Sequence, residues 1–398
     1  MMSQKSKHEL LEVAWSHYLK AGKVEKQKIL DEFTCATGYH RKHAIRVLKN
    51  RVPRRKRRKR TGYQTTYRGE VVQALAQIWE IYGHICSKRL QPFLPEAIRV
   101  LERCQEINIS KDTKELLLKI SSASIDRCLR PIRSKTPHGL STTKPGSLLK
   151  NLIPVRTFTE WDEERPGFME IDLVAHCGNT TEGQFLCTLT CTDLCTGWTD
   201  VTGLLHRSQE AVSEALSRMR QRLPFPLLGI DSDNGGEFTL APGASAGVND
   251  LLYRYCLDEK ITFTRSRPYQ KNDQAHVEHT CPGGRCQGKN WSVVRHTVGY
   301  DRWETQQELA LLESIYDDLR LYINFFQPSF KLIARERIDN KTLKRYDTAK
   351  TPYQRVLERK DISLEAKARL AHLYIQLNPA ELRRRIEQKI AMLWKISR

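Results

Sequence analysis

The chain has 398 residues, 39% of them hydrophobic, and its 66 Lys and Arg against 46 Asp and Glu give a formal net charge of +20. This length and apolar content exclude a disordered chain and predict roughly two to four domains. The sequence has neither an apolar run of about 18 residues nor a signal-peptide pattern, so we expect no membrane span. The excess of positive charge favours a nucleic-acid partner over a merely soluble basic protein.

The first predicted domain, residues 1–50, is helical. "HELLEVAWSHYLKAG" has apolar residues at helical spacing, and "KQKILDEFTCATGYHRKHAIRVLKN" has the pattern of a helix, a turn at Gly38 and a second helix. In a helix-turn-helix the second helix enters the major groove of DNA. Its outward-facing residues, our candidate DNA contacts, are Tyr39, Arg41, Lys42 and Arg46. An ordinary helical hairpin with a charged outer face is the alternative.

A strongly basic segment follows at residues 51–66, where eight of the ten residues of "RVPRRKRRKR" are Lys or Arg. Because like charges repel, we expect a solvated arm or linker there. Such an arm would release counterions on DNA and could lie along the minor groove. A tether without a partner and a nuclear localisation signal are the alternatives. The candidate contacts are Arg54, Arg55, Lys56, Arg57, Arg58, Lys59 and Arg60.

The next predicted region, residues 67–133, is again helical. "GEVVQALAQIWEIYG" and "LPEAIRVLERC" are amphipathic, and the second has Pro95 near its first turn. "KDTKELLLKISSASIDRCLRPIR" repeats the helix-turn-helix shape, with Asp112 and Glu115 as a predicted capping box. Two outward-facing arginines of this segment are further candidate DNA contacts: Arg127 and Arg130. Residues 134–157 are rich in Pro, Gly, Ser and Thr, which is typical of a linker.

Strand-like patterns replace helical ones in residues 158–304. "MEIDLVAH" is a predicted strand with Glu170 and Asp172 on one face. It is followed by two strands, a helix, the strand of "LLGIDSDNGGEF", a helix, a strand and a last helix. This is the order of elements in an RNase H-like α/β domain. Three cysteines recur every four residues, and we expect them to pack in the core rather than bind metal: Cys187, Cys191 and Cys195. The 11 scattered cysteines favour reduced thiols over a disulfide framework.

Acidic residues stand at three informative places in this domain: Asp172 in the first strand, Asp233 after the fourth, and Glu278 on the last helix. An RNase H-like fold brings these points together at one edge of the sheet. Converging carboxylates repel one another unless divalent cations lie between them. Two Mg²⁺ ions about 4 Å apart activate the attacking oxygen and stabilise the leaving oxygen of a phosphodiester. The alternative for Asp231 and Asp233 is ordinary turn chemistry after a strand.

"MEIDLVAH", "GIDSDNGGEF" and "RSRPYQKNDQAHVE", in this order, resemble the catalytic core of retroviral-integrase-like DDE transposases from bacterial insertion sequences. The resemblance implies that Asp172, Asp233 and Glu278 are the catalytic triad and hold Mg²⁺, with Mn²⁺ as a substitute. It also implies a homo-oligomer in the bacterial cytoplasm, associated with the nucleoid, whose partner is double-stranded DNA. Such an enzyme binds element ends, cleaves a phosphodiester and joins the 3′-hydroxyl to target DNA.

One departure from that family follows Glu278, where residues 279–288 insert "HTCPGGRCQG". No helix continues through Pro-Gly-Gly, so the insertion separates Glu278 from Lys289, which the resemblance makes a DNA contact. It could be a surface loop or the mark of an inactivated element. It also offers a zinc set of uncommon spacing: His276, His279, Cys281 and Cys286. The alternative functions are therefore a catalytically impaired DNA-binding protein, such as a repressor of its own element, or a plain nuclease.

The last predicted region, residues 305–398, is helical. "QQELALLESIYDDLRLYINFF" has apolar residues at helical spacing, and "NPAELRRRIEQKIAMLWK" begins with Asn378 as a cap and Pro379 at the first position. A subunit contact and a DNA clamp are both open for this final helix, beside a plain charged outer face. The predicted fold class is thus multidomain, with an all-α helix-turn-helix region, a central RNase H-like α/β catalytic core and a C-terminal helical region.

Overall fold

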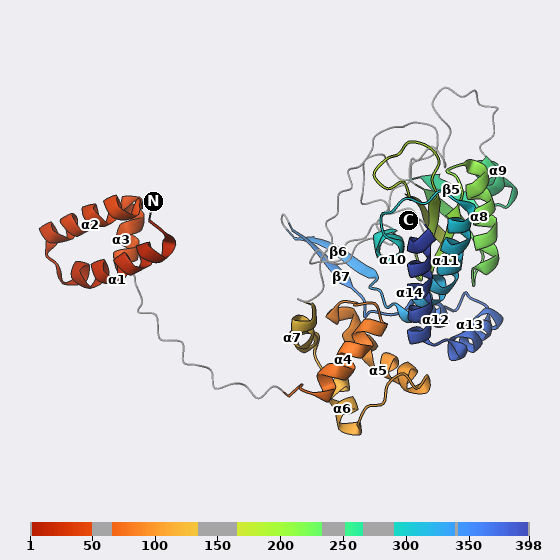
Figure 1. Ribbon diagram of the computed structural model, residues 1–398, viewed down its shortest axis with the longest axis horizontal. Helices are drawn as coiled ribbons and strands as arrows, with labels where there is room; N and C mark the ends of the chain where they lie inside the picture. Colours follow the sequence, from red (N-terminus) through yellow and green to blue (C-terminus); the bar gives the residue numbers. More distant parts are fainter. Residues whose placement is uncertain are drawn as a thin grey trace. The chain divides into compact units, whose positions relative to one another are not determined.

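The structure, a computed structural model, describes residues 2–49, 66–133, 165–232, 251–265, 290–338 and 341–396. The chain forms two compact units, unit 1 (Met1–Thr66) and unit 2 (Tyr67–Arg398). Figure 1 colours their elements along the sequence. No helix in the described ranges is long and apolar enough to cross a membrane.

Unit 1 contains three helices: α1 (Gln4–Lys20), α2 (Lys23–Thr37) and α3 (Arg41–Lys49). Apolar residues spaced along all three form one small core: Leu11, Tyr18, Leu30, Phe33, Ala44 and Leu48. α2 ends at Gly38, whose φ of 69° is left-handed and favours glycine over other residues. The predicted helix, turn and helix are therefore confirmed as secondary structure.

Unit 2 begins with four helices: α4 (Glu70–Ile81), α5 (Ser87–Arg103), α6 (Lys111–Lys119) and α7 (Ser122–Arg133). The predicted start of α5 is wrong, because the helix begins eight residues before Pro95 and contains both Pro92 and Pro95. Each proline lacks the N–H that an interior turn uses. Burial of the opposite face offsets this cost, and that face includes Leu90, Phe93, Leu94, Ala97, Ile98 and Leu101.

The N-terminal cap of α6 also differs from the prediction. Ser110, and not a box of Asp112 and Glu115, caps α6 by accepting a hydrogen bond from the backbone N–H of Thr113 at 3.3 Å. α7 continues through Pro131 to Arg133. The capping position depends on where the chain enters the helix, and the hydroxyl of Ser110 is held there by the carboxylate of Glu70 on α4.

A five-stranded sheet forms the centre of unit 2, in the order β3-β2-β1-β4-β5. β1 runs antiparallel to β2 and parallel to β4, β2 is antiparallel to β3, and β4 is parallel to β5. The strands are β1 (Phe168–Ala175), β2 (Cys187–Asp193), β3 (Thr199–Leu204), β4 (Gly229–Ser232) and β5 (Thr262–Arg265). Helix α8 (Gln209–Arg222) connects β3 to β4, and α9 (Leu251–Asp258) lies between β4 and β5. This mixed α/β core is confirmed, and its elements follow the predicted order from β1 to β5, whereas the predicted last helix with Glu278 falls outside the described residues.

Different helices cover the two faces of edge strand β3. Arg222 of α8 donates to the Thr202 hydroxyl at 2.7 Å, whereas Gly203 faces α11 (Gln306–Phe326), where an added Cβ would lie 2.7 Å from Leu309. Neighbouring strand residues point to opposite faces. Asn324 of α11 also binds the backbone of Thr199 through both its side-chain oxygen and nitrogen, at 2.8 and 2.7 Å. These contacts fix α11 against the sheet and cover its open edge.

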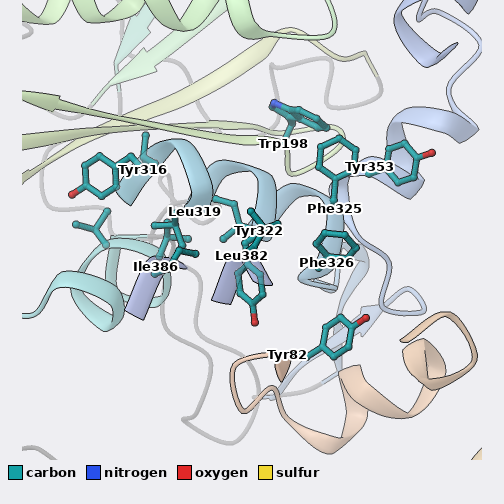
Figure 2. Packing of buried hydrophobic residues seen from close by; sticks show 14 of the residues in the cluster. Tyr82, Trp198, Tyr316, Leu319, Tyr322, Phe325, Phe326, Tyr353, Leu382 and Ile386 are labelled. Atoms are coloured by element: carbon teal, nitrogen blue, oxygen red, sulfur yellow. The ribbon is translucent and has the colours of Figure 1, made fainter. Parts of the chain in front are cut away.

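One hydrophobic core joins the sheet to the surrounding helices of unit 2. Figure 2 shows aromatic residues of α11 between Trp198, which precedes β3, and Tyr82, which follows α4. α11 also packs along α14 (Pro379–Ile396), where Leu382 and Ile386 are buried. Helices α4–α7 are therefore built into the same unit as the sheet.

The C-terminal region is mainly helical, as predicted, but the prediction missed two strands after α11. β6 (Leu332–Ile338) and β7 (Lys341–Tyr346) form an antiparallel two-stranded sheet. "LIARERI" has three consecutive apolar residues followed by three consecutive charged ones, so no period-two alternation marked β6 in the sequence. Helices α12 (Pro352–Glu358), α13 (Leu364–Gln376) and α14 follow. Asn378 caps α14 as predicted, by accepting from the N–H of Ala380 at 2.9 Å.

Candidate functional site

Acidic residues lie on one face of the central strands β1 and β4. The parallel register pairs Glu170 with Asp231 and Ile171 with Ser232. Cross-strand partners share a face, as do residues two apart in one strand, so Glu170, Asp172 and Asp231 lie on the same face. A row of paired polar residues crosses all five strands here: Thr199, Thr192, Glu170, Asp231 and Thr264.

The three carboxylates have different surroundings. Glu170 is 1% exposed, whereas Asp172 and Asp231 are half-buried. The Oδ1 atom of Asp231 accepts a hydrogen bond from the Thr264 hydroxyl at 2.8 Å, which connects β4 to β5. Oδ1 of Asp172 accepts a hydrogen bond from the adjacent backbone N–H of Leu173 at 2.8 Å.

The other members of the predicted triad, Asp233 and Glu278, lie outside the described residues, as do Lys289, the insertion at residues 279–288 and the basic arm. The proposed zinc set also falls there: His276, His279, Cys281 and Cys286. Within the ranges that the structure describes, no three His, Cys, Asp or Glu side chains are grouped so as to hold a metal ion.

The first described element after β5 lies beside β1. There η1 (Asn290–Arg295), a π-helical segment, leads into the short helix α10 (His296–Val298), and Val294 and Val298 are fully buried. The Arg295 guanidinium donates to the backbone carbonyl of Ala175, the last residue of β1. This hydrogen bond holds η1 against the end of β1, because Ala175 is three residues after Asp172 in that strand.

Behind this strand end lies His176, a residue that the sequence analysis did not single out. Its side chain is fully buried, and Nε2 lies 2.7 Å from the Thr188 hydroxyl, which in turn lies 2.6 Å from the hydroxyl of Tyr316. Burial, with a smaller effect of the nearby Arg295 charge, lowers the pKa of His176 to about 3. A neutral imidazole therefore joins β1, β2 and α11. Its place at the end of "MEIDLVAH" was the only signal in the sequence.

The candidate DNA contacts of unit 1 differ in exposure. Tyr39 was expected to face outward, but it is half-buried, with its ring centroid 6.2 Å from Phe33 and 4.8 Å from His43. A three-helix unit has little apolar area, so the ring is drawn into the core. Arg41 is half-buried and forms an ion pair with Asp31. Two other candidates are exposed, as expected: Lys42 and Arg46.

In unit 2, the α7 candidates Arg127 and Arg130 are both exposed, and Arg127 donates to the hydroxyl of Ser124 at 2.8 Å. The expectation that three cysteines pack in the core is confirmed. Cys187 and Cys191 are at most 1% exposed in β2, and Cys195 is 6% exposed just after it.

No family model matches the chain. A search of curated proteins finds "Uncharacterized protein y4rM" of Sinorhizobium fredii, which is 38% identical over 358 residues, or 89% of this chain and 96% of that protein. The chain belongs to the y4rM family. The match to y4rM is longer than unit 2, so it includes part of unit 1.

Among solved structures, the catalytic core domain of BIV integrase matches 48% of this chain and 94% of its own length. That match has 17% sequence identity and a TM-score of 0.30, which is too low to carry an assignment for the y4rM family.

Proposed function

We propose that the protein is a DNA transposase that cleaves and joins phosphodiester bonds with divalent metal ions. The observation that carries the proposal is the β1–β4 register. Ile171 pairs with Ser232, the last described residue of β4. In the sequence Asp172 follows Ile171 and Asp233 follows Ser232, and Asp172 is half-buried on the polar face of the sheet. Carboxylates are the hard oxygen ligands that Mg²⁺ prefers.

In this proposal Asp172, Asp233 and Glu278 hold the metal ions. When bound, Mg²⁺ would activate the attacking oxygen and stabilise the leaving oxygen of the scissile phosphodiester. Glu278 is twelve residues before η1, which is anchored beside β1 by Arg295.

Asp231 has a structural role in the proposed site. Its Oδ1 atom is engaged by Thr264, and its partner across the strands is the buried Glu170. A hydrogen bond from a neighbouring strand stabilises the sheet beneath the metal ligands without leaving that oxygen for a cation. Asp231 is therefore the natural control for Asp172.

Double-stranded DNA is the proposed partner, both as element ends and as target, with the protein acting as a homo-oligomer. The net charge of +20 favours a polyanion. Exposed basic residues on predicted recognition helices support contacts in both units, and these residues are Lys42, Arg46, Arg127 and Arg130. The basic arm, Arg54–Arg60, would add sequence-independent contacts to phosphates.

A second candidate function is DNA binding without catalysis. The observation that favours it is η1, which is π-helical and begins two residues after the insertion at residues 279–288. The Pro-Gly-Gly of that insertion also disfavours a helix that runs on from Glu278. If the insertion moves the Glu278 carboxylate away from the metal ions, DNA binding would persist while DNA cleavage is lost.

The test is strand cleavage of a labelled duplex that carries the DNA flanking the gene, in Mg²⁺ or Mn²⁺. We expect Asp172→Asn to reduce cleavage at least about 100-fold, because losing a metal ligand removes several kcal/mol of transition-state stabilisation. Asp231→Asn is the matched control and should retain most activity. DNA binding by both variants should equal that of the wild type.

Equal loss of cleavage in both variants would contradict the assignment of Asp172 over Asp231. Wild-type protein that binds the duplex tightly but cleaves it in neither metal would favour the second candidate function. In that case, deleting residues 279–288 should restore cleavage.

A further inference from the structure

Helix α13 (Leu364–Gln376) carries a line of apolar residues on its solvent side, here called the α13 stripe. Leu364 is 83% exposed and Ile375 is 66% exposed, although both are large aliphatic residues. Between them, Ala368 is exposed and Ala371 is half-buried. Steps of four, three and four residues join these positions, which places them on one line along the helix. Single exposed apolar residues are common, but a continuous line on a helix at the edge of unit 2 (Figure 1) indicates a contact with another protein surface.

The opposite side of α13 fixes how the helix is turned about its axis. Tyr374 is 9% exposed, and its ring centroid lies 4.7 Å from that of Tyr353 in α12 and 6.1 Å from that of Phe325 in α11. At the C-terminal end of the helix, the Arg103 guanidinium donates to the backbone carbonyls of Tyr374 and Leu377 at 3.1 and 3.0 Å. The α13 stripe is therefore held in a constant orientation toward solvent.

The stripe matches itself when two copies of the helix pack antiparallel. About a two-fold axis at its midpoint, Leu364 meets the partner's Ile375, and Ala368 meets the partner's Ala371, because the members of each pair are equally far from that midpoint. Large side chains then pack at both ends of the contact. The small alanines in the middle allow the two helix backbones to approach closely.

Charged residues beside the stripe also suit an antiparallel pair. Glu365 and His372 are both exposed, and their spacing of seven residues puts them on the same flank of the stripe. In the antiparallel pair each Glu365 lies near the partner's His372, so a carboxylate that accepts meets an imidazole N–H that donates, once on each side of the axis. This complementarity favours a second copy of the chain as the occupant of the stripe.

We propose that two copies of the chain associate through their α13 stripes, packed antiparallel about a two-fold axis. The proposal rests on the proposed function, because it names the surface through which the proposed homo-oligomer forms. It uses residues of unit 2 that take no part in the proposed metal site or in the proposed DNA contacts.

The size of the stripe sets the strength of this association. α13 has 13 residues, so at about 1.5 Å for each residue it is about 20 Å long. A contact along one such helix is smaller than the roughly 800 Å² for each partner that stable complexes bury. The association is therefore weak and reversible for free protein. Two copies bound to one DNA molecule would be at a high effective concentration, which strengthens the contact.

The test uses two complementary substitutions in the full-length chain, Leu364→Lys and Ile375→Glu. In a symmetric pair of either variant, each introduced charge lies against an apolar side chain of the partner. When the two variants are mixed, the introduced lysine of one chain meets the introduced glutamate of the other, and the unchanged Ile375 meets the unchanged Leu364. Leu257→Lys is the matched control, because Leu257 of α9 is 58% exposed but lies outside the stripe.

Sedimentation velocity over about 1–200 μM protein measures the association, and thermal unfolding shows that each variant keeps its fold. We expect the wild type and Leu257→Lys to associate reversibly in this range. Each stripe variant alone should associate at least about 100-fold more weakly, because the two-fold axis repeats the burial of an unpaired charge at both ends. The equimolar mixture of the two variants should associate with a Kd within about tenfold of the wild-type value.

Association that persists in both variants alone would overturn the proposal, because another surface would then join the copies. Equal weakening by Leu257→Lys would overturn it as well, as would a wild type that stays monomeric up to about 200 μM. Failure of the mixture to associate would refute the antiparallel pairing. Wild-type protein that associates through α13 but binds no DNA duplex would instead refute the proposed function, so the two proposals fail separately.

Discussion

Acidification should destabilise unit 2 through His176. The imidazole is fully buried, and burial lowers its pKa to about 3, whereas an unfolded chain has a histidine pKa of about 6.5. Between these values the unfolded state binds one more proton than the folded state. The free energy of unfolding therefore falls as the pH falls, by up to about 1.4 kcal/mol per pH unit. From pH 7 to pH 5 the contribution of His176 is a loss of about 2 kcal/mol.

Urea unfolding followed by tryptophan fluorescence at pH 7 and pH 5 measures this loss. His176→Gln keeps an amide that can bond to Thr188 but does not titrate. We expect the wild type to lose about 2 kcal/mol more than this variant over the two pH units. His206→Gln, at an exposed position, is the matched control and should behave as the wild type does. Identical pH dependence in the wild type and His176→Gln would refute the reasoning.

Two further predictions concern backbone geometry and capping. Gly167→Ala should lower the free energy of unfolding by about 1–3 kcal/mol, because φ is 112° and an added Cβ would lie 2.3 Å from the Pro226 carbonyl oxygen. Gly22→Ala, with open space around it, should change stability little, and thermal unfolding compares the two. Ser110→Ala should cost about 1 kcal/mol through loss of the α6 cap. Asp112→Ala should cost less in the same denaturation assay, and the reverse order would restore Asp112 as the cap.

Local patterns predicted much of the secondary structure. Helical periodicity placed α8 and α11, and alternation placed β1, because these signals depend only on neighbouring residues. The same reasoning failed where packing overrides propensity. α5 contains two prolines because its apolar face is buried, and Tyr39 is half-buried because its ring packs against Phe33 at the core of unit 1.

The candidate site was predictable only in part. The sequence showed that Glu170 and Asp172 share a face of one strand, since a strand alternates by a period of two. It also showed two acidic residues around the end of the fourth strand. It did not show that the hydroxyl of Thr264 binds Asp231, or that His176 is held behind β1 by Thr188, because both partners come from other strands.

By itself, then, the sequence determined the positive charge, the two faces of β1 and the order of helices and strands from β1 to β5, all of which are local or additive properties. Only the tertiary structure decided that β4 is the parallel neighbour of β1, although two strands and a helix separate them in the chain. That pairing sets Asp231 opposite Glu170 and ends with Ser232 opposite Ile171, one residue before Asp172. Strand pairing depends on which apolar faces α8 and α11 can bury together with the sheet, and no single stretch of the chain contains that information.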